Sequence, residues 1–353
     1  MRFRDRDAPI TDDGLIFRTY GYDHPPGSCF CDLEYAPETL YRSDDPRAVR
    51  DGLPKKYYKF YFDGGLKFAL NRDPPYKLLH KPLGVEIVGV DESRISRVVK
   101  PEQRLQELLE TESDPLAKAC EEVLSLVTDG SSLKRKDFGV FGSLAHGFYN
   151  PRYSDIDLIV YGKKQLTELR ETLGELYGDG DLRNEFEDWT PRDPPAHWNF
   201  TNYSKEEHGP SQLRKGIYAT YDSKALNRSV KVEFEPVRRW DEITNEYGSI
   251  NRITSLGRVE ATGEILAGDE GGFIPSVYPM RLLEISSNVD CGDVLRIVSY
   301  VEEFRLQLEA GETALIRGNL ERVERKDRVF HQITLSYGED YFDQVLKPIE
   351  SPR

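Results

Sequence analysis

Two aspartates interrupt an otherwise apolar strand in the stretch GSLAHGFYNPRYSDIDLIVYG, residues 142–162. Side chains alternate along a strand, so Asp155 and Asp157 project to one face while Ile156 and Leu158 face a core. Two carboxylates on one rigid edge repel each other, and their burial costs free energy without a compensating charge. A hard divalent cation is their natural partner, so the pattern predicts a metal-binding pair. A solvated strand edge is the alternative.

The residues just before this strand suit the approach of an anion. Gly142 lets the backbone come close to a ligand, and Ser143 adds a hydroxyl group. A short apolar strand at 138–141 ends here, and a helix that begins at this turn points its free N–H groups toward an anion. One strand therefore supplies a phosphate cradle and the next supplies metal ligands, which is the layout for metal-assisted phosphoryl chemistry.

Helical and strand periods alternate around this motif. Leucines at 105, 108 and 109 predict one helix, and a second runs from Asp114-Pro115 to Gly130. After the strand that carries the aspartates, leucines from Leu166 to Leu176 share the face of a helix that ends at Gly178. The run SVKVEFEPV at 229–237 alternates as a further strand. Residues 179–216 carry no assignable pattern.

The flanking regions read as β-rich, which predicts an α+β multidomain chain. Residues 56–70 are expected to form a hairpin closed by Asp63-Gly64-Gly65. Toward the C-terminus, FRLQLE (304–309) and two runs around the charged turn ERKDR (324–328) alternate as strands. Short strands at this density predict a small barrel, and an OB-like barrel fits best. The expected domains are 1–98 (β-rich), 99–248 (the α/β domain with the motif) and 249–353 (the barrel).

Composition limits the classes of function. A net charge of −14 argues against a protein coated by nucleic acid, although it permits a local basic groove. The start of the chain lacks the apolar core of a signal peptide, and no stretch is apolar enough to cross a bilayer, so a cytoplasmic protein without membrane contact is expected. The four cysteines lack zinc-site spacing and are expected to be reduced; they are Cys29, Cys31, Cys120 and Cys291.

The central motif resembles that of the nucleotidyltransferases of the DNA polymerase β superfamily. In that family, Gly-Ser follows an apolar strand, and a spacer leads to Asp-x-Asp in the next strand. Here residues 144–154, eleven in number, separate Ser143 from Asp155. The finer pattern G-S-x-A-x-G, then P, then S-D-I-D-L is similar to the compact bacterial and archaeal members. The resemblance extends over about residues 100–245.

The resemblance implies a set of metal ligands. Asp155 and Asp157 would hold two Mg²⁺ ions, for which Mn²⁺ is expected to substitute. A third carboxylate on a later strand would bind the metal at the attacking hydroxyl. The strand 229–237 offers Glu233 and Glu235 on one face, and we favour Glu233 because apolar residues flank it on both sides. Glu235, beside Pro236, is the alternative.

The chain departs from the family in the Gly-Ser helix. Compact members often carry arginines there that meet the triphosphate, whereas this sequence has Leu144 and His146. We expect His146 to serve in packing rather than as a catalytic base. Gly142 and Ser143 would cradle the phosphates, and their charge would be met by other cations; the candidates are Arg152, Lys163, Lys164, and the pair Arg214-Lys215.

The implied reaction moves an NMP from an NTP to a hydroxyl, and RNA is the favoured acceptor. A protein or small-molecule acceptor is the alternative, as is a non-catalytic member that binds nucleotide or RNA. No feature indicates a fixed oligomeric state.

Two features of the sequence are relevant to RNA binding. Lys55, Tyr57, Lys59 and Tyr61 would form an outward ladder able to bind phosphates and bases, or simply an exposed strand face. A basic cluster in residues 317–328 would bind nucleic acid, or form a mixed-charge solvated hairpin.

Overall fold

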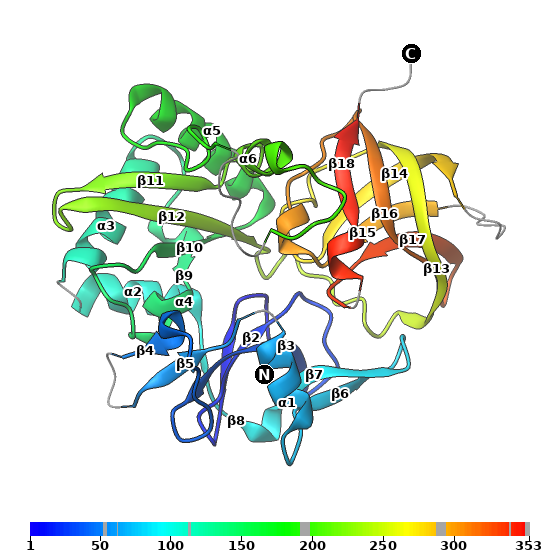
Figure 1. Cartoon of the computed structure of the whole chain (residues 1–353), viewed down its shortest axis with the longest axis horizontal. Helices are drawn as coiled ribbons and strands as arrows, with labels where there is room; N and C mark the ends of the chain where they lie inside the picture. The colour runs from blue at the N-terminus through cyan, green and yellow to red at the C-terminus, as the bar shows by residue number, and fades with distance from the viewer. Residues whose placement is uncertain are drawn as a thin grey trace. The chain divides into compact units, whose positions relative to one another are not determined.

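The computed structural model describes residues 1–51, 55–61, 63–111, 114–190, 198–286, 294–338 and 340–349. The chain divides into two compact units (Figure 1). Unit 1 contains Met1–His80, Val85–Asn184 and Ile217–Asn245, and unit 2 contains Lys81–Gly84, Glu185–Gly216 and Glu246–Arg353. Helices and three β-sheets together confirm the predicted mixed α/β class. The division into three domains stays a prediction; its first boundary lies within unit 1.

An eight-stranded sheet forms the N-terminal part of unit 1. Its main path is β4-β5-β3-β2-β1-β8, and β7 joins β3 to β6. The strands are β1 (Ala8–Thr11), β2 (Ile16–Thr19), β3 (Ser28–Pro37), β4 (Val49–Arg50), β5 (Tyr57–Lys59), β6 (Lys77–His80), β7 (Val85–Asp91) and β8 (Ile95–Val99). Short 3₁₀ turns occur at Pro46–Ala48 and Glu92–Arg94. A core of mostly apolar side chains, including Phe17, Leu33 and Val90, holds this sheet together.

The expected hairpin at residues 56–70 is wrong, because a helix follows β5. Helix α1 (Gly64–Asn71) begins at the Gly-Gly pair that was expected to close a turn. A Cβ atom on Gly65 would collide with the carbonyl oxygen of Leu33, so this glycine lets α1 lie directly on β3. Packing on the sheet therefore decided a short run that alternation alone could not assign. Phe62 lies outside the described residues.

The second sheet of unit 1 carries the aspartate motif. Its order is β11-β12-β10-β9, with β10 parallel to β12 and antiparallel to β9. The strands are β9 (Phe138–Val140), β10 (Ile156–Tyr161), β11 (Tyr218–Ser223) and β12 (Arg228–Val237). The strands expected at 138–141, 155–162 and 229–237 are thus present. Each has a buried apolar face, for example Leu158 and Phe234.

Four helices accompany this sheet: α2 (Pro101–Thr111), α3 (Pro115–Asp129), α4 (Gly142–His146) and α5 (Lys163–Asp179). Asp114 caps α3 as expected, since its Oδ1 accepts from the backbone N–H groups of Leu116 and Ala117. Cys120 is buried on the apolar face of α3. The leucines at 166, 169, 173 and 176 are buried along α5, which extends one residue past Gly178 and ends at Gly180.

The sheet of unit 2 closes on itself. Strands β13 (Ile250–Ile265), β14 (Ser276–Ile285), β15 (Val294–Ser299), β16 (Thr313–Arg325) and β17 (Val329–Leu335) pair in the order β13-β14-β15-β17-β16, and β13 pairs again with β16. The β15–β17 pair is parallel, and β18 (Val345–Ile349) extends β16. The two strands predicted around residues 324–328 are present. The strand expected at 304–309 is wrong, because a 3₁₀ turn at Glu302–Phe304 leads into irregular chain.

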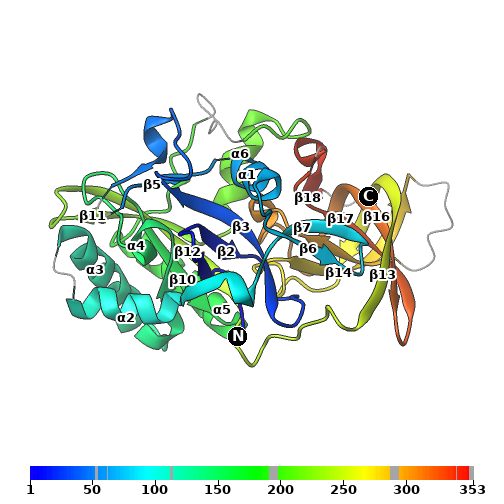
Figure 2. The ribbon, with the colours of Figure 1, turned by 90° about the horizontal axis from the view of Figure 1, so that it is seen from below.

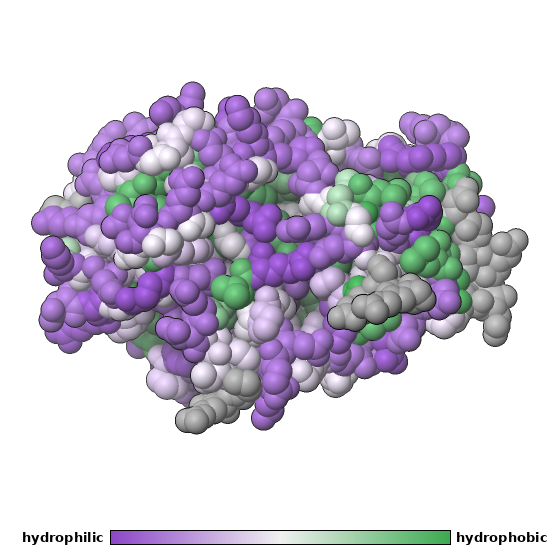
Figure 3. Space-filling view, turned by 90° about the horizontal axis from the view of Figure 1, so that it is seen from above, coloured by the Kyte–Doolittle hydropathy of each residue, from purple (hydrophilic) through white to green (hydrophobic). Residues whose placement is uncertain are grey.

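Unit 2 also contains α6 (Lys205–Leu213), in the region without a sequence pattern, and a 3₁₀ turn at Tyr341–Asp343. Figure 3 shows mostly hydrophilic residues on the face that it presents, with hydrophobic residues gathered over the sheet of unit 2. No helix among the described residues is long and apolar enough to span a membrane. Cys29, Cys31 and Cys120 are buried free thiols, and Cys291 lies outside the described residues.

Candidate active site

The parallel pairing of β10 with β12 places two carboxylates side by side. Asp157 lies opposite Glu233, and Ile159 lies opposite Glu235. Neighbouring strands are about 4.8 Å apart, and residues in register point to the same face. Asp155 immediately precedes β10 and is exposed, while Asp157 and Glu233 are half-buried. Asp155, Asp157 and Glu233 therefore gather at one end of the sheet, with the outermost carboxylate open to solvent.

The Gly-Ser turn lies directly against this pair. Gly142 has a φ of +62°, and a Cβ atom there would fall well inside the contact distance of Asp157 Oδ2. The backbone N–H of Phe141 donates to the carbonyl of Asp157 at 3.0 Å. Glycine is thus required twice at position 142, for its backbone conformation and for the close approach. Ser143 follows in α4 and is half-buried.

The loop that leads into Asp155 is held in one conformation. The backbone N–H of Asn150 donates to Ser154 Oγ at 2.9 Å, and the backbone N–H of Arg152 donates to Asn150 Oδ1 at 3.0 Å. Arg228 at the start of β12 donates to the carbonyls of Ser154 (2.5 Å) and Pro151 (3.2 Å). This loop displays Arg152 as an exposed cation three residues before Asp155.

The environment of Asp157 disfavours its charged form. Burial raises the pKa of the Asp157 carboxyl to about 7, and Lys59 opposes that rise. Three other carboxylates add to it, namely those of Asp155, Glu235 and Glu34. A carboxylate that titrates near neutral pH among other carboxylates is typical of a functional site, because a bound cation removes the penalty that the bare site carries.

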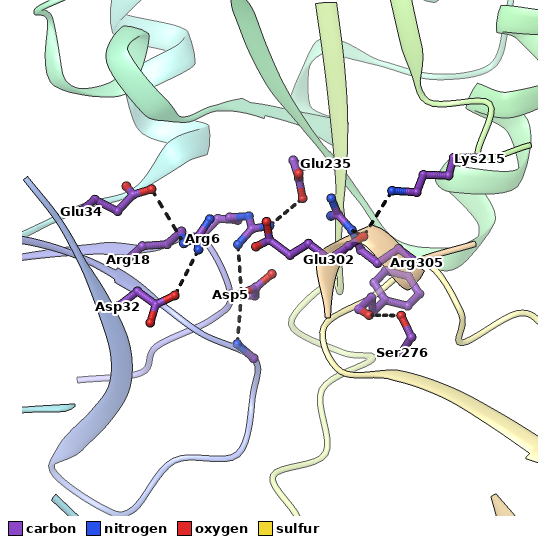
Figure 4. A network of polar contacts seen from close by, with 12 residues as sticks. Asp5, Arg6, Arg18, Asp32, Glu34, Lys215, Glu235, Ser276, Glu302 and Arg305 are labelled. Atoms are coloured by element: carbon purple, nitrogen blue, oxygen red, sulfur yellow. Dashed lines mark hydrogen bonds and ion pairs between the residues drawn. The ribbon is translucent and has the colours of Figure 1, made fainter. Parts of the chain in front are cut away.

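The deeper carboxylate, Glu235, is engaged in a buried ion pair. Arg6 Nη2 lies 2.7 Å from Glu235 Oε2, and the two side chains are 0% and 4% exposed (Figure 4). Arg6 has a φ of +68°, a left-handed conformation that is uncommon for a residue with a Cβ atom. Its guanidinium carbon lies 5.8 Å from the Phe141 ring centroid, beside the Gly-Ser turn. The N-terminal segment thereby reaches the sheet that carries the motif.

A small pocket lies between the N-terminal sheet and α4, beside Arg6. Arg6, Arg18 and Glu34 line it from the N-terminal sheet, and Gly142 and His146 line it from α4. Arg18 lies between two carboxylates, 3.1 Å from Asp32 and 3.8 Å from Glu34 (Figure 4). The register of β3 against β2 skips Glu34, and such a bulge turns adjacent side chains toward the same side.

His146 has the packing role that its setting predicted. Its ring lies 5.6 Å from Tyr35 and 5.3 Å from Phe148, and burial lowers the pKa of the imidazole to about 4. The Lys–Tyr ladder expected on β5 is wrong in either form, because Tyr57 is 8% exposed and its ring lies 5.7 Å from Phe148. The face that carries Tyr57 points toward α4 rather than into solvent.

Several residues that were predicted to contact phosphate lie away from the aspartates. Lys163 begins α5 beyond the opposite end of β10, and the four strand residues after Asp157 alone span about 13 Å. Lys164 is exposed beside it. Arg214 and Lys215 belong to unit 2, where Arg214 pairs with Glu312 at 2.5 Å, and Lys215 is buried and donates to a backbone carbonyl. Arg152 is thus the predicted cation that the structure places next to the aspartates.

The structure also adds residues that the motif did not indicate. Arg6, Glu34 and Lys59 come from the N-terminal sheet, more than eighty residues before the Gly-Ser turn. A signal for Arg6 was present, since the charged run Arg4–Asp7 follows directly on Phe3 and is wholly buried. Four adjacent charges are buried only where partners compensate them, which predicts a tertiary network around such a run.

The chemistry of the donors fits a hard cation. Carboxylate oxygens are the ligands that Mg²⁺ prefers, and this ion usually takes one or two carboxylates and fills its shell with water and substrate phosphates. No group of three or more His, Cys, Asp or Glu residues in the described ranges is arranged to hold a metal by itself, so Asp155, Asp157 and Glu233 do not form a complete metal site in this structure.

Comparisons with known proteins agree with this geometry. Residues 120–217 match the family model described as a nucleotidyltransferase domain, a range that includes Gly142, Ser143, Asp155 and Asp157. An uncharacterized protein of Methanocaldococcus jannaschii, MJ1086, is 26% identical over 98% of this chain and 99% of its own length. No solved structure matches the chain. Residues 120–217 are therefore a nucleotidyltransferase domain of the DNA polymerase β superfamily.

Proposed function

We propose that this protein is a Mg²⁺-dependent nucleotidyltransferase that moves an NMP from an NTP to a hydroxyl acceptor. The observation that carries the proposal is the meeting of Asp157, Glu233 and Gly142 at one end of the sheet, with Asp155 open to solvent beside them. Asp155 and Asp157 would hold two Mg²⁺ ions, and Glu233 would complete the site at the attacking hydroxyl. Glu235 is less suited, since Arg6 already neutralises it.

The reaction that fits these groups is an in-line displacement at the α-phosphorus. The acceptor oxygen forms the new O–P bond, the bond to the β-phosphate bridge breaks, and pyrophosphate leaves with the electron pair. Bound Mg²⁺ supplies charge neutralisation for both oxygens. Glu233 would orient the acceptor hydroxyl and take its proton, and the backbone at Gly142 and Ser143 would hold the departing phosphates. The elevated pKa of Asp157, about 7, means that the site binds cations most tightly above neutral pH.

We propose further that the C-terminal barrel is OB-like and that RNA is the acceptor. Five strands in the order β13-β14-β15-β17-β16, closed through β13 and β16, support an OB-like barrel, an architecture that often binds oligonucleotides. The basic residues at 317–328 lend little support to RNA binding. Arg322 pairs with Glu324, and Arg325 pairs with Glu246 at 3.0 Å, as in a mixed-charge solvated hairpin. A protein or small-molecule acceptor remains the alternative.

Label transfer tests the function and the acceptor together. The intact protein and the variant Asp155→Ala/Asp157→Ala are incubated with each α-labelled NTP and Mg²⁺ in a lysate of the source cells. We expect label in RNA with the intact protein and none with the variant. Label in protein or in a small molecule instead would replace RNA as the acceptor. No difference between the two proteins, with Mn²⁺ also tried, would indicate a non-catalytic binding protein.

Gly142→Ala tests the contact between the Gly-Ser turn and the aspartates. The new methyl group strains the left-handed backbone and displaces the Asp157 carboxylate. A displacement of about 1 Å is expected to reduce transfer by roughly 100-fold. Gly174→Ala on α5 is the control, because nothing lies within 4 Å of the added atom and activity should be unchanged. Substantial activity in Gly142→Ala would show that the close approach does not matter.

A further inference from the structure

Two cations of the N-terminal sheet, Arg50 and Lys59, form no ion pair with a carboxylate among the described residues. Arg50 ends β4 and Lys59 ends β5, and both side chains are half-buried. Arg50 donates to the carbonyls of Arg47 and Val49, and no ion pair joins either Arg50 or Lys59 to a carboxylate in the described part of the chain. In a chain with a net charge of −14, half-buried cations without an ion-pair partner are suited to an external anion.

Two cations close by in the chain, Arg47 and Lys56, are already paired with carboxylates. Arg47 lies 2.7 Å from Asp45, and Lys56 lies 3.9 Å from Glu38. Arg50 and Lys59 therefore differ from Arg47 and Lys56, each of which lies three residues earlier in the chain, in lacking an ion-pair partner among the described residues. The contrast also supplies matched controls for an experiment.

The strand register directs both cations toward the candidate active site. Arg50 pairs with Tyr57, and Lys59 pairs with Tyr35, so these four side chains share one face of the N-terminal sheet. The rings of Tyr35 and Tyr57 lie 4.8 Å and 5.7 Å from that of Phe148, which follows α4. Figure 2 shows β5 and α4 as neighbours. The face that carries Arg50 and Lys59 thus borders the helix of the Gly-Ser turn.

Electrostatics agrees with this placement. Lys59 lowers the pKa of Asp157, against the effect of burial, so its ammonium group lies close enough to act on the motif aspartate. The cations inside the Gly-Ser helix that meet the triphosphate in compact relatives are replaced here by Leu144 and His146. A triphosphate that approaches Gly142 would therefore need cations from outside the Gly-Ser helix, and the N-terminal sheet offers two.

We propose that Arg50 and Lys59 bind the β- and γ-phosphates of the NTP, so that the N-terminal sheet supplies the cations that the Gly-Ser helix lacks. The inference rests on the proposed nucleotidyl transfer. Arginine offers a planar fork of donors that matches phosphate oxygens, and lysine offers a compact charge. Together they stabilise the negative charge that grows on pyrophosphate as it leaves.

Binding measurements on the full-length protein test the assignment without requiring turnover. Titration calorimetry with Mg²⁺ compares inorganic tripolyphosphate and each NTP on the intact protein and on Arg50→Gln and Lys59→Gln. Each variant is expected to raise the Kd by about 10- to 100-fold, the loss of one charge-assisted hydrogen bond. Arg47→Gln and Lys56→Gln carry the same change of charge three residues earlier in the chain, and their Kd should stay within about 2-fold of the intact protein.

The possible outcomes separate the two proposals. If the intact protein binds NTP and neither Arg50→Gln nor Lys59→Gln weakens it, or if the controls weaken it equally, the phosphate assignment is overturned while the transferase proposal stands. If the intact protein binds neither NTP nor tripolyphosphate, both fall. Should Lys59→Gln unfold, Lys59→Arg preserves the charge and should bind within about 5-fold of the intact protein. Binding lost in a folded Lys59→Arg variant would also overturn the assignment.

Discussion

Replacing Asp157 by asparagine is expected to abolish nucleotidyl transfer and, at pH 8, to stabilise the fold. In the proposed mechanism Asp157 would hold Mg²⁺, and a neutral amide lacks the charge for that role, so transfer should fall by about 10³-fold or more. At the same time, the variant removes a carboxylate that burial holds in an unfavourable environment. Functional sites commonly carry such a cost in stability. Label transfer and thermal unfolding in EDTA measure the two effects.

The pH dependence of the stabilisation follows from the direction of the pKa shift. The pKa of Asp157 is about 7 in the folded protein, above its ordinary value of 3.8. Between these two values the folded state binds more protons than the unfolded state, so the free energy of unfolding falls as pH rises through this window. The side-chain amide of the Asp157→Asn variant does not titrate. The variant should therefore match the intact protein near pH 4 and exceed it by up to about 4 kcal/mol at pH 8, because one pKa unit corresponds to about 1.4 kcal/mol.

Asp155→Asn is the matched control for this experiment. It lies two residues away on the same face but is exposed, so its loss should reduce transfer while raising the unfolding midpoint at pH 8 far less than Asp157→Asn does, through the repulsion that Asp155 exerts on Asp157. An Asp157→Asn variant that is less stable than the intact protein at pH 8 would show that Lys59 and its surroundings need the charge. A fully active variant would remove Asp157 from the site altogether.

The second large effect is expected from Arg6→Met. This change leaves Glu235 buried without its cation, and Asp5, whose Oδ1 is 3.9 Å from Arg6, also loses a neighbouring charge. Breaking one partner of a buried pair costs about 3–5 kcal/mol, because the remaining charge stays desolvated. Urea or thermal unfolding measures the loss of stability. Because Arg6 and Glu235 both belong to unit 1, this unit should unfold first in the variant.

Two further variants isolate the cause. Arg6→Met/Glu235→Gln removes both charges and should recover more than half of the lost stability. Arg183→Met breaks an exposed pair with Asp222, 2.7 Å apart on the same unit, and should cost less than about 1 kcal/mol. If Arg6→Met costs no more than Arg183→Met, the buried pair does not anchor the N-terminal segment.

Local patterns predicted most elements of the central sheet and its helices. The apolar alternation of β10 and β12 and the Asp114-Pro115 start of α3 are features that nearby residues decide. The failures share a cause. Helix α1 and the irregular chain after Phe304 replaced expected strands, because in short runs the contacts with distant elements outweigh the intrinsic preference.

The residues of the candidate site also differ in whether the local sequence predicts them. Gly142, Ser143, Asp155 and Asp157 were predictable, because a turn and an adjacent strand fix their spacing within twenty residues of chain. The pairing of Glu233 with Asp157 required the register between two strands that lie more than seventy residues apart. A period of two predicts that Glu233 and Glu235 share a face, but it cannot say which of them stands beside the aspartate.

The sequence by itself determined the class of chemistry, because the motif places carboxylates and a flexible turn through local geometry alone. Only the tertiary structure decided what surrounds them. It brought Arg6 to Glu235, and Lys59 into the field of Asp157, across more than ninety residues of chain. Charges act through space and burial sets their strength, so the partners of a carboxylate depend on which sheets pack together. The order of residues along the chain does not contain that information in any local form.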